Sequence, residues 1–307
     1  MKPLTNFILG ILMLFALSSC NGLRQAPEFS AERSFGYLTS QVALGPRVPG
    51  SESSRLARQM YVAHFQSCGL AVDSQKFVIF DPYSGRETTM VNVIARYSGN
   101  NDDRILLMAH YDCRPRSERS TDSLLRNNPI DGANDGASGV AILMELANLC
   151  KESAPPVDID FALVDGEDWG KEGDKNHYSL GSREFARRGI RGKYRFAIVV
   201  DMVGDKELTI TREGFSELYG GELNDAVFQA AHSLGIAAFE NRVGDSLIDD
   251  HLPLQAAGVP TIDIIDFKYA YWHTEQDTPD KCSPQSLAAV GRVLAHVLYN
   301  PSLWPSK

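Results

Sequence analysis

The chain has 307 residues, of which 43% are hydrophobic and 22% charged, an ordinary globular composition that is long enough for a large core and excludes a disordered chain. Its formal net charge of −9 argues against nucleic acid as a partner. An acidic balance keeps a protein soluble without selecting a ligand, so it indicates no substrate.

The N-terminus predicts a secretory signal followed by a lipidation site. Lys2 precedes an apolar run over residues 7–17, which is too short to span a membrane comfortably. The Leu-Ser-Ser-Cys sequence ending at Cys20 resembles the bacterial lipobox, which implies cleavage before this cysteine and its lipidation. The alternative is an ordinary signal peptide. We expect a signal peptide over residues 1–19, a lipidated tether over 20–35, and a lipid-anchored protein on the periplasmic side of a bacterial envelope.

Residues 36–307 are predicted to form one domain, because no repeat or long linker divides them. Runs rich in β-branched or apolar residues predict strands over residues 90–95, 104–110, 158–164, 195–201 and 259–265. Apolar residues recur with helical spacing from Val140 to Ala147, and Ser283 before Pro284 begins a terminal helix. This alternation is typical of an α/β fold with a central mixed, mostly parallel sheet flanked by helices.

The remaining cysteines predict neither a zinc finger nor a particular disulfide. They are Cys68, Cys113, Cys150 and Cys282. Four thiols allow three pairings, and their spacing matches no zinc finger, while buried free thiols are an equal alternative. The sequence therefore leaves disulfide pairing open.

Polar residues that can bind a metal gather where the predicted strands end. They are His110 and Asp112 after one strand, Glu167 and Asp168 after the next, Asp201 after a third and His273 beyond a fourth. Asp135 stands just before a helix, where an N-cap role is the structural alternative. Carboxylates and imidazoles are the ligands of catalytic zinc, which takes three of them and keeps one position open. Their occurrence at successive strand ends predicts a zinc site at this sheet edge.

Five segments in this order resemble the superfamily of zinc aminopeptidases and animal-type glutaminyl cyclases, from about residue 35 to the C-terminus. They are His110–Asp112, Gly132–Gly139, Asp165–Asp168, Asp201–Gly204 and Trp272–Thr274. The resemblance implies that Asp135, Asp168 and His273 bind one zinc ion and that Glu167 transfers protons. The animal cyclases carry Glu where this chain has Asp168, so the ligand geometry is open.

Two further segments resemble bacterial enzymes of the glutaminyl cyclase branch. Residues Asp249–His251 resemble the Asp-Asp-His sequence of glutaminyl cyclases, whereas two-zinc aminopeptidases usually have Ser-Asp-His at this place. A Trp directly before the late His, here Trp272, also resembles the cyclases. The resemblance implies that Asp249 shares hydrogen bonds with Asp201, one carboxyl staying protonated, and that both serve catalysis. In aminopeptidases the counterpart of Asp201 instead binds a second metal beside the bridging Asp135.

The neighbouring aromatic and polar residues are given supporting roles. Trp272 and Trp169 are expected to wall the substrate pocket, with core packing as the alternative for Trp169. In a cyclase, His110 and Asp112 become scaffold at the edge of the site. His251 belongs either to the outer part of the site or to the fold alone.

The resemblance thus implies a zinc-dependent glutaminyl-peptide cyclotransferase, which converts an N-terminal glutamine to pyroglutamate and releases ammonia. Its expected partners are peptides or proteins with N-terminal glutamine and a membrane reached through Cys20. Because the attack is intramolecular, it needs no water nucleophile, and one zinc suffices. A zinc aminopeptidase and a non-catalytic envelope lipoprotein are the alternatives, which metal content and ammonia release distinguish.

Overall fold

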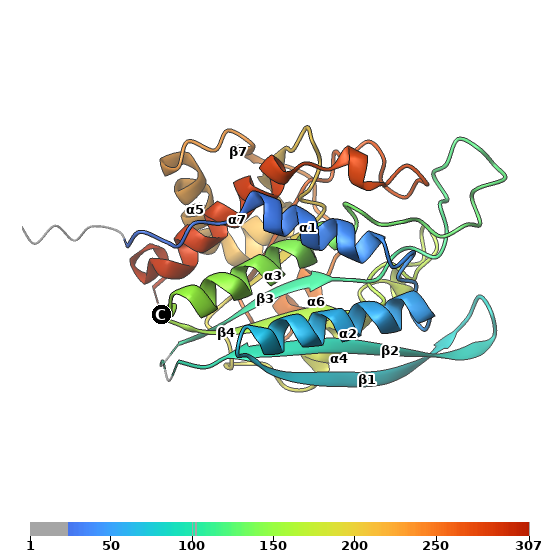
Figure 1. Cartoon of the computed structure of the whole chain (residues 1–307), viewed down its shortest axis with the longest axis horizontal. Coiled ribbons are helices and arrows are strands. Elements are labelled where there is room, and N and C mark those ends of the chain that lie inside the picture. The colour runs from blue at the N-terminus through green and yellow to red at the C-terminus, as the bar shows by residue number, and fades with distance from the viewer. Residues whose placement is uncertain (1–23, 100, 102, 307) are drawn as a thin grey trace, which may run out of the picture.

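The computed structural model describes residues 24–99, 101 and 103–306 (Figure 1). The predicted signal peptide and Cys20 lie outside these residues. No helix in the described part of the chain combines the length and apolar character that crossing a membrane requires. The folded body begins before the predicted boundary at residue 36, because the apolar Phe29 is buried against Gly291 and Ser30 caps the first helix. The described end of the predicted tether is therefore packed on the domain.

Strands and helices alternate along the chain as the sequence predicts. The strands are β1 Ala71–Asp81, β2 Arg86–Tyr97, β3 Arg104–His110, β4 Asp158–Val164, β5 Ala197–Asp201, β6 Ile210–Arg212, β7 Phe239–Val243 and β8 Thr261–Ile265. The α-helices are α1 Ala31–Val42, α2 Glu52–Ser67, α3 Ala137–Glu152, α4 Leu180–Arg187, α5 Gly214–Ser233, α6 His251–Ala256 and α7 Pro284–Tyr299. Short 3₁₀ turns are η1 Lys175–His177, η2 Pro279–Lys281 and η3 Pro301–Leu303.

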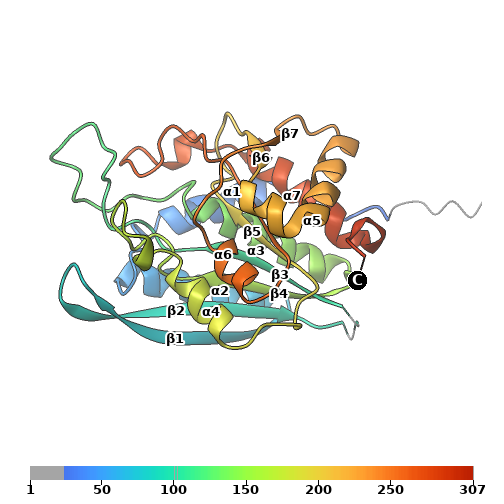
Figure 2. The same cartoon turned by 180° about the vertical axis from the view of Figure 1, so that it is seen from behind.

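Among the described residues, six strands form one mixed sheet in the order β1-β2-β4-β3-β5-β8. β1 and β2 are antiparallel, as are β2 and β4, while β4, β3, β5 and β8 run parallel. Figure 1 shows α1, α2, α3 and α7 in front of the sheet, and Figure 2 shows α4 and α6 on the opposite side. Helix α5 packs against the edge strand β8 and against α7, with which it shares one core. The predicted α/β fold with a mostly parallel sheet is confirmed.

The burial of each element explains how well the sequence predicts it. Every residue of β4 is buried between two helical layers, which is why its apolar run has the same bounds in sequence and structure. The N-cap of α7 is Ser283, whose hydroxyl accepts a hydrogen bond from the backbone N–H of Ser286 at 3.1 Å. The edge strand β1 is half exposed, and β6 and β7 are short, so their patterns are too weak to predict strands.

The topology brings the polar strand ends together. The parallel strands β3, β4, β5 and β8 all end at one edge of the sheet. A long segment between β3 and α3 leaves this edge as the projecting green loop in Figure 1 and returns at Asp135. The first turn of α3 lies close to β5, because a Cβ at Gly139 would meet the carbonyl oxygen of Val200 at 2.0 Å. The start of α3 therefore joins the strand ends.

Candidate active site

The three predicted zinc ligands lie together at this edge. Asp135, Asp168 and His273 are buried, and each offers a ligand atom within 4.8 Å of the others. The Nε2 atom of His273 is 3.3 Å from Asp168 Oδ1 and 3.7 Å from Asp135 Oδ2. Asp168 Oδ2 is buried and has no hydrogen-bond partner among the described residues. Two carboxylates and one imidazole are a ligand set that zinc accepts, so these residues fit the metal.

The backbone that carries the acidic pair is held by Asp112. Its Oδ1 atom accepts a hydrogen bond from the N–H of Glu167 at 3.1 Å, and its Oδ2 atom accepts one from the N–H of Asp168 at 3.2 Å. Asp112 is fully buried, so these bonds are made in a region shielded from water. This geometry fits the predicted scaffold role and aims both acidic side chains toward the site.

A second carboxylate, Asp277, holds the start of α3 in the same way. It accepts hydrogen bonds from the N–H groups of Asn134 at 2.8 Å and Asp135 at 3.1 Å, and from the Tyr269 hydroxyl at 2.7 Å. Burial, followed by the charge of Asp135, raises the pKa of Asp277 to about 7. Asp277 therefore positions a ligand without itself belonging to the ligand set.

A second cluster of potential ligands shares Asp135 with the first. His110 Nε2 lies 3.1 Å from Asp135 Oδ1 and 3.0 Å from Asp201 Oδ1. Burial opposes protonation of His110, but the charge of Asp201 and hydrogen bonds to its carboxylate neighbours outweigh burial and raise the pKa of His110. Burial raises the pKa of Asp201, and His110 lowers it. The charges of Asp249 and Asp135 raise it further, so that the pKa of Asp201 is about 7. This cluster can bind a second cation or a shared proton.

Glu167 lies beside the ligands and faces the same cavity. Burial raises the pKa of its carboxyl group well above the usual value, and the charges of Asp249 and Asp168 raise it further. The hydroxyl of Ser179 donates a hydrogen bond to Glu167 Oε1 at 3.4 Å. A carboxyl group with a raised pKa both accepts and returns protons near neutral pH. The position and environment of Glu167 thus fit the predicted proton-transfer role.

A cavity of about 440 Å³ opens over these residues, and Trp272 forms part of its wall. The indole ring lies 3.9 Å from the His273 ring between centroids, and the Arg119 guanidinium is 4.2 Å from the centroid of the same indole. Apolar lining is supplied by Met202, Leu247, Ile248, Ile265 and Phe267. The site therefore combines a polar floor with apolar walls.

Trp169 packs in the interior, which is the alternative that the sequence left open, and does not line the cavity. Its side chain is 8% exposed, and its Nε1–H donates a hydrogen bond to Asp81 Oδ1 at 3.2 Å. It is absent from the residues that line the 440 Å³ cavity in the described chain. The hydrogen bond to the end of β1 turns the indole toward the β1–β2 hairpin, which corrects the prediction for this residue.

Asp249 has Asp263 as a buried carboxyl neighbour, which the sequence analysis did not pair with it. The Oδ1 atom of Asp249 accepts a hydrogen bond from the backbone N–H of Asp250. Neither oxygen of Asp263 has a hydrogen-bond partner among the described residues, so the two neighbouring carboxyl groups can share one proton. Burial, then the charges of Asp249 and Asp201, raises the pKa of Asp263 well above its ordinary value. The charge of Asp249 also contributes to the raised pKa of Asp201.

His251 lies behind this carboxyl pair and belongs to the outer part of the site. Its Nδ1 atom is 3.5 Å from Asp263 Oδ2, and its Nε2 atom is 3.3 Å from Glu213 Oε2. The imidazole is fully buried between two acidic side chains. His251 therefore connects Asp263 to the start of α5.

Sequence reasoning missed Asp263 and Asp277. Asp263 was open to detection, since a carboxylate stands alone in the apolar strand β8, where an unpaired charge is costly. Asp277 follows β8 in an irregular segment, and no local pattern marks it. Its role depends on contact with residues more than a hundred positions earlier.

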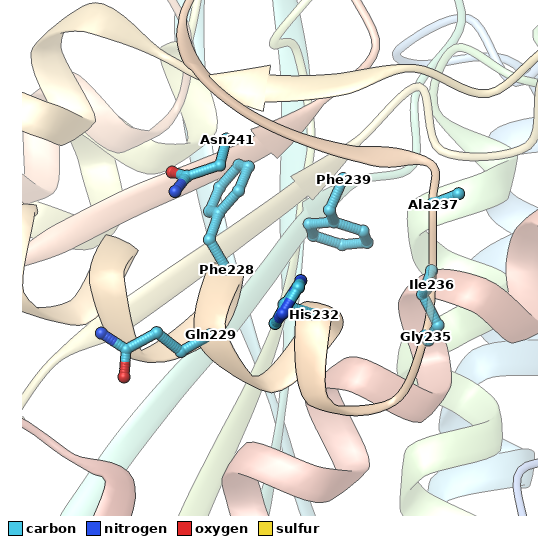
Figure 3. Close-up of a pocket in the computed structure, with 8 residues that line it drawn as sticks. All are labelled: Phe228, Gln229, His232, Gly235, Ile236, Ala237, Phe239 and Asn241. Atoms are coloured by element: carbon cyan, nitrogen blue, oxygen red, sulfur yellow. The ribbon is translucent and has the colours of Figure 1, made fainter.

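A further cavity of about 540 Å³ lies beside α5 and β7 and does not share the chemistry of the first. Figure 3 shows Phe228 and His232, both on α5, close to Phe239 at the start of β7. The ring centroids of the two phenylalanines are 5.4 Å apart. None of the eight described residues that line it carries a carboxylate. The arrangement therefore offers no ligand set for a catalytic metal.

Comparison with known proteins agrees with the fold. Residues 92–298 match the profile of Peptidase family M28. The crystal structure of Bacteroides thetaiotaomicron glutaminyl cyclase bound to N-acetylhistamine is 33% identical, with a TM-score of 0.86 and coverage of 90% of this chain and 99% of that one.

Two curated relatives share less of the sequence. Bos taurus glutaminyl-peptide cyclotransferase-like protein is 25% identical, over 81% of this chain and 70% of that protein. The alkaline phosphatase isozyme conversion protein of Escherichia coli (strain K12) is 27% identical, and the match spans 64% of this chain but only 58% of that protein. The family match covers more than half of the chain, and the protein is therefore a member of peptidase family M28.

Proposed function

We propose that this protein is a zinc-dependent glutaminyl-peptide cyclotransferase. The observation that carries the proposal is a buried set of Asp135, Asp168 and His273 that shares one cavity with Glu167 and Asp249. Its similarity over nearly the whole chain to a bacterial glutaminyl cyclase supports the same activity. The substrate class is peptides or proteins with an N-terminal glutamine.

We propose one zinc ion per chain, held by Asp135, Asp168 and His273. Zinc bound there supplies Lewis acidity toward the side-chain amide oxygen of the substrate glutamine. Glu167 accepts a proton from the attacking α-amine and returns it to the departing ammonia, which its raised pKa favours. Asp249, paired with Asp263, is placed to orient the substrate amide from the same cavity.

The shape of the cavity suits an intramolecular reaction. The α-amine and the γ-carboxamide belong to one residue, so the protein has to hold this residue in a folded conformation. Trp272 and the neighbouring apolar side chains pack against its aliphatic part and exclude water. Hydrolysis consumes a water molecule and ring closure does not, so the exclusion of water favours ring closure.

A direct assay tests this proposal. Purified protein with zinc is expected to release ammonia from a Gln-initiated dipeptide and to yield a pyroglutamyl product of correspondingly lower mass. A Leu-initiated dipeptide, which has no γ-carboxamide, should remain intact under the same conditions. Mass spectrometry and an ammonia assay measure both reactions. Free leucine without pyroglutamate would assign the protein to the aminopeptidases.

The second candidate function, a zinc aminopeptidase, is favoured by one observation. The cluster of His110, Asp135 and Asp201 offers a second set of ligand atoms beside the first, which would suit a two-zinc site. In a cyclase with one zinc, His110 instead bridges Asp135 and Asp201 by hydrogen bonds. The substrate assay and the zinc content therefore separate the two functions.

We further propose that Cys20 anchors the mature protein by a lipid on the periplasmic side of a bacterial envelope, on the basis of its lipobox-like sequence. Cys20→Ala is expected to move the protein from the membrane fraction to the soluble fraction, or to block its maturation, because the thiol receives the lipid. Immunoblotting of cell fractions measures this. Ser18→Ala keeps a small residue and the thiol and should stay in the membrane fraction. A cleaved Cys20→Ala protein that still pellets with membranes would contradict the anchor.

A further inference from the structure

Arg114 is a buried cation beside the proposed ligands that has no part in the reaction described above. Its side chain is completely buried. One arm of the guanidinium donates to Asp168 through Nη1. On its other side, Nε donates to Glu118 Oε2 at 3.0 Å and Nη2 donates to the Tyr178 hydroxyl at 3.0 Å. The guanidinium is therefore held by its own partners while it contacts Asp168.

This contact leaves Asp168 with one free oxygen. Arg114 and His273 both approach Oδ1, whereas Oδ2 is buried and has no hydrogen-bond partner among the described residues. An Asp carboxylate turns about a short arm, so engaging one oxygen restricts the direction of the other. The backbone N–H of Asp168 also donates a hydrogen bond to Asp112 Oδ2 at 3.2 Å. Backbone and side chain are thus both restrained, with Oδ2 left to meet a cation.

Stability alone is a weak reason to bury this charge. Removing a guanidinium from water carries a penalty that its ion pairs only partly offset, and buried ion pairs are often replaceable by apolar residues without loss of stability. A fork of donors in fixed geometry does have a specific use, which is to orient a carboxylate.

We propose that Arg114 is a positioning residue for the metal, which fixes Asp168 through Oδ1 so that Oδ2 is presented as the ligand atom. Glu118 and Tyr178 in turn fix Arg114. The inference rests on the zinc site of the proposed function and assigns a role to a residue outside the ligand set. Partners of this kind typically contribute ~10-fold to ~100-fold to metal affinity.

The test measures zinc affinity by competition with a chelator, using wild-type protein and Arg114→Lys. Lysine keeps the positive charge but lacks the planar fork, so zinc binding is expected to weaken by ~10-fold to ~100-fold. The matched control is Arg116→Lys, because Arg116 lies in the same segment and donates to the carbonyls of Trp169 and Gly170 instead of to a ligand side chain. Its zinc affinity should equal that of the wild type.

A second variant decides the matter if Arg114→Lys does not fold. Glu118→Gln leaves Arg114 and Asp168 in place but removes the charge that restrains the guanidinium, and it should weaken zinc binding in the same direction by a smaller factor. Circular dichroism of the zinc-free proteins checks the fold. Wild-type affinity in every folded variant would overturn the inference and leave the proposed function intact. Wild-type protein that binds no zinc would instead refute the metal site and, with it, the proposed function.

Discussion

Glu167→Gln should lower the rate of cyclisation by at least ~10²-fold, the scale of one proton-transfer group. Glutamine keeps the shape of the side chain and the hydrogen bond from Ser179, but it cannot accept a proton from the attacking amine. Zinc content should stay at the wild-type value because Glu167 is not in the proposed ligand set. Steady-state rates on a Gln-initiated dipeptide, together with elemental analysis, measure both quantities.

The control for this prediction is Glu172→Gln. Glu172 also lines the cavity, but its side chain is 63% exposed and forms an ion pair with Arg119 at 2.9 Å. Surface pairs of this kind contribute little, so its removal should leave the turnover number close to that of the wild type. A Glu167→Gln protein with an undiminished rate would show that another group moves the proton.

Asp249→Ala should also lower cyclisation by at least ~10²-fold, the effect of removing one positioned polar group from an active site. Two consequences follow from the structure. The substrate amide loses a partner in the cavity, and Asp263 is left buried without its carboxyl neighbour. Zinc should remain bound, because Asp249 is separate from the proposed ligands.

The role of the Asp249–Asp263 pair can be separated from that of Asp249 alone. Asp263→Asn removes the acidic proton while keeping a hydrogen-bond donor toward Asp249, so it should lower the rate less than Asp249→Ala does. Asp245→Ala is the control, since Asp245 is an exposed residue on the same cavity rim. Turnover number and Michaelis constant on a Gln-initiated dipeptide are the measurements. An Asp249→Ala enzyme with full activity would show that the cyclase assignment is wrong.

The sequence by itself determined the class of fold and the identity of the candidate ligands. Strands β3 and β4 have the bounds that their apolar runs predict, because residues buried on both faces leave an unbroken local pattern. The polar residues directly after these strands stand out against that pattern. Since parallel strands end at one edge, their convergence followed from chain order alone.

Only the tertiary structure decided which side chains pair within the site. Arg114 reaches Asp168 across 54 positions of sequence, and Asp277 reaches Asn134 across 143. Asp263 is a buried carboxyl neighbour of Asp249, although the two residues lie on different elements. Such contacts depend on how helices and loops pack against the sheet, and periodicity records only which face of an element is apolar. Side chains that meet across distant elements therefore leave no local pattern by which a sequence reveals them.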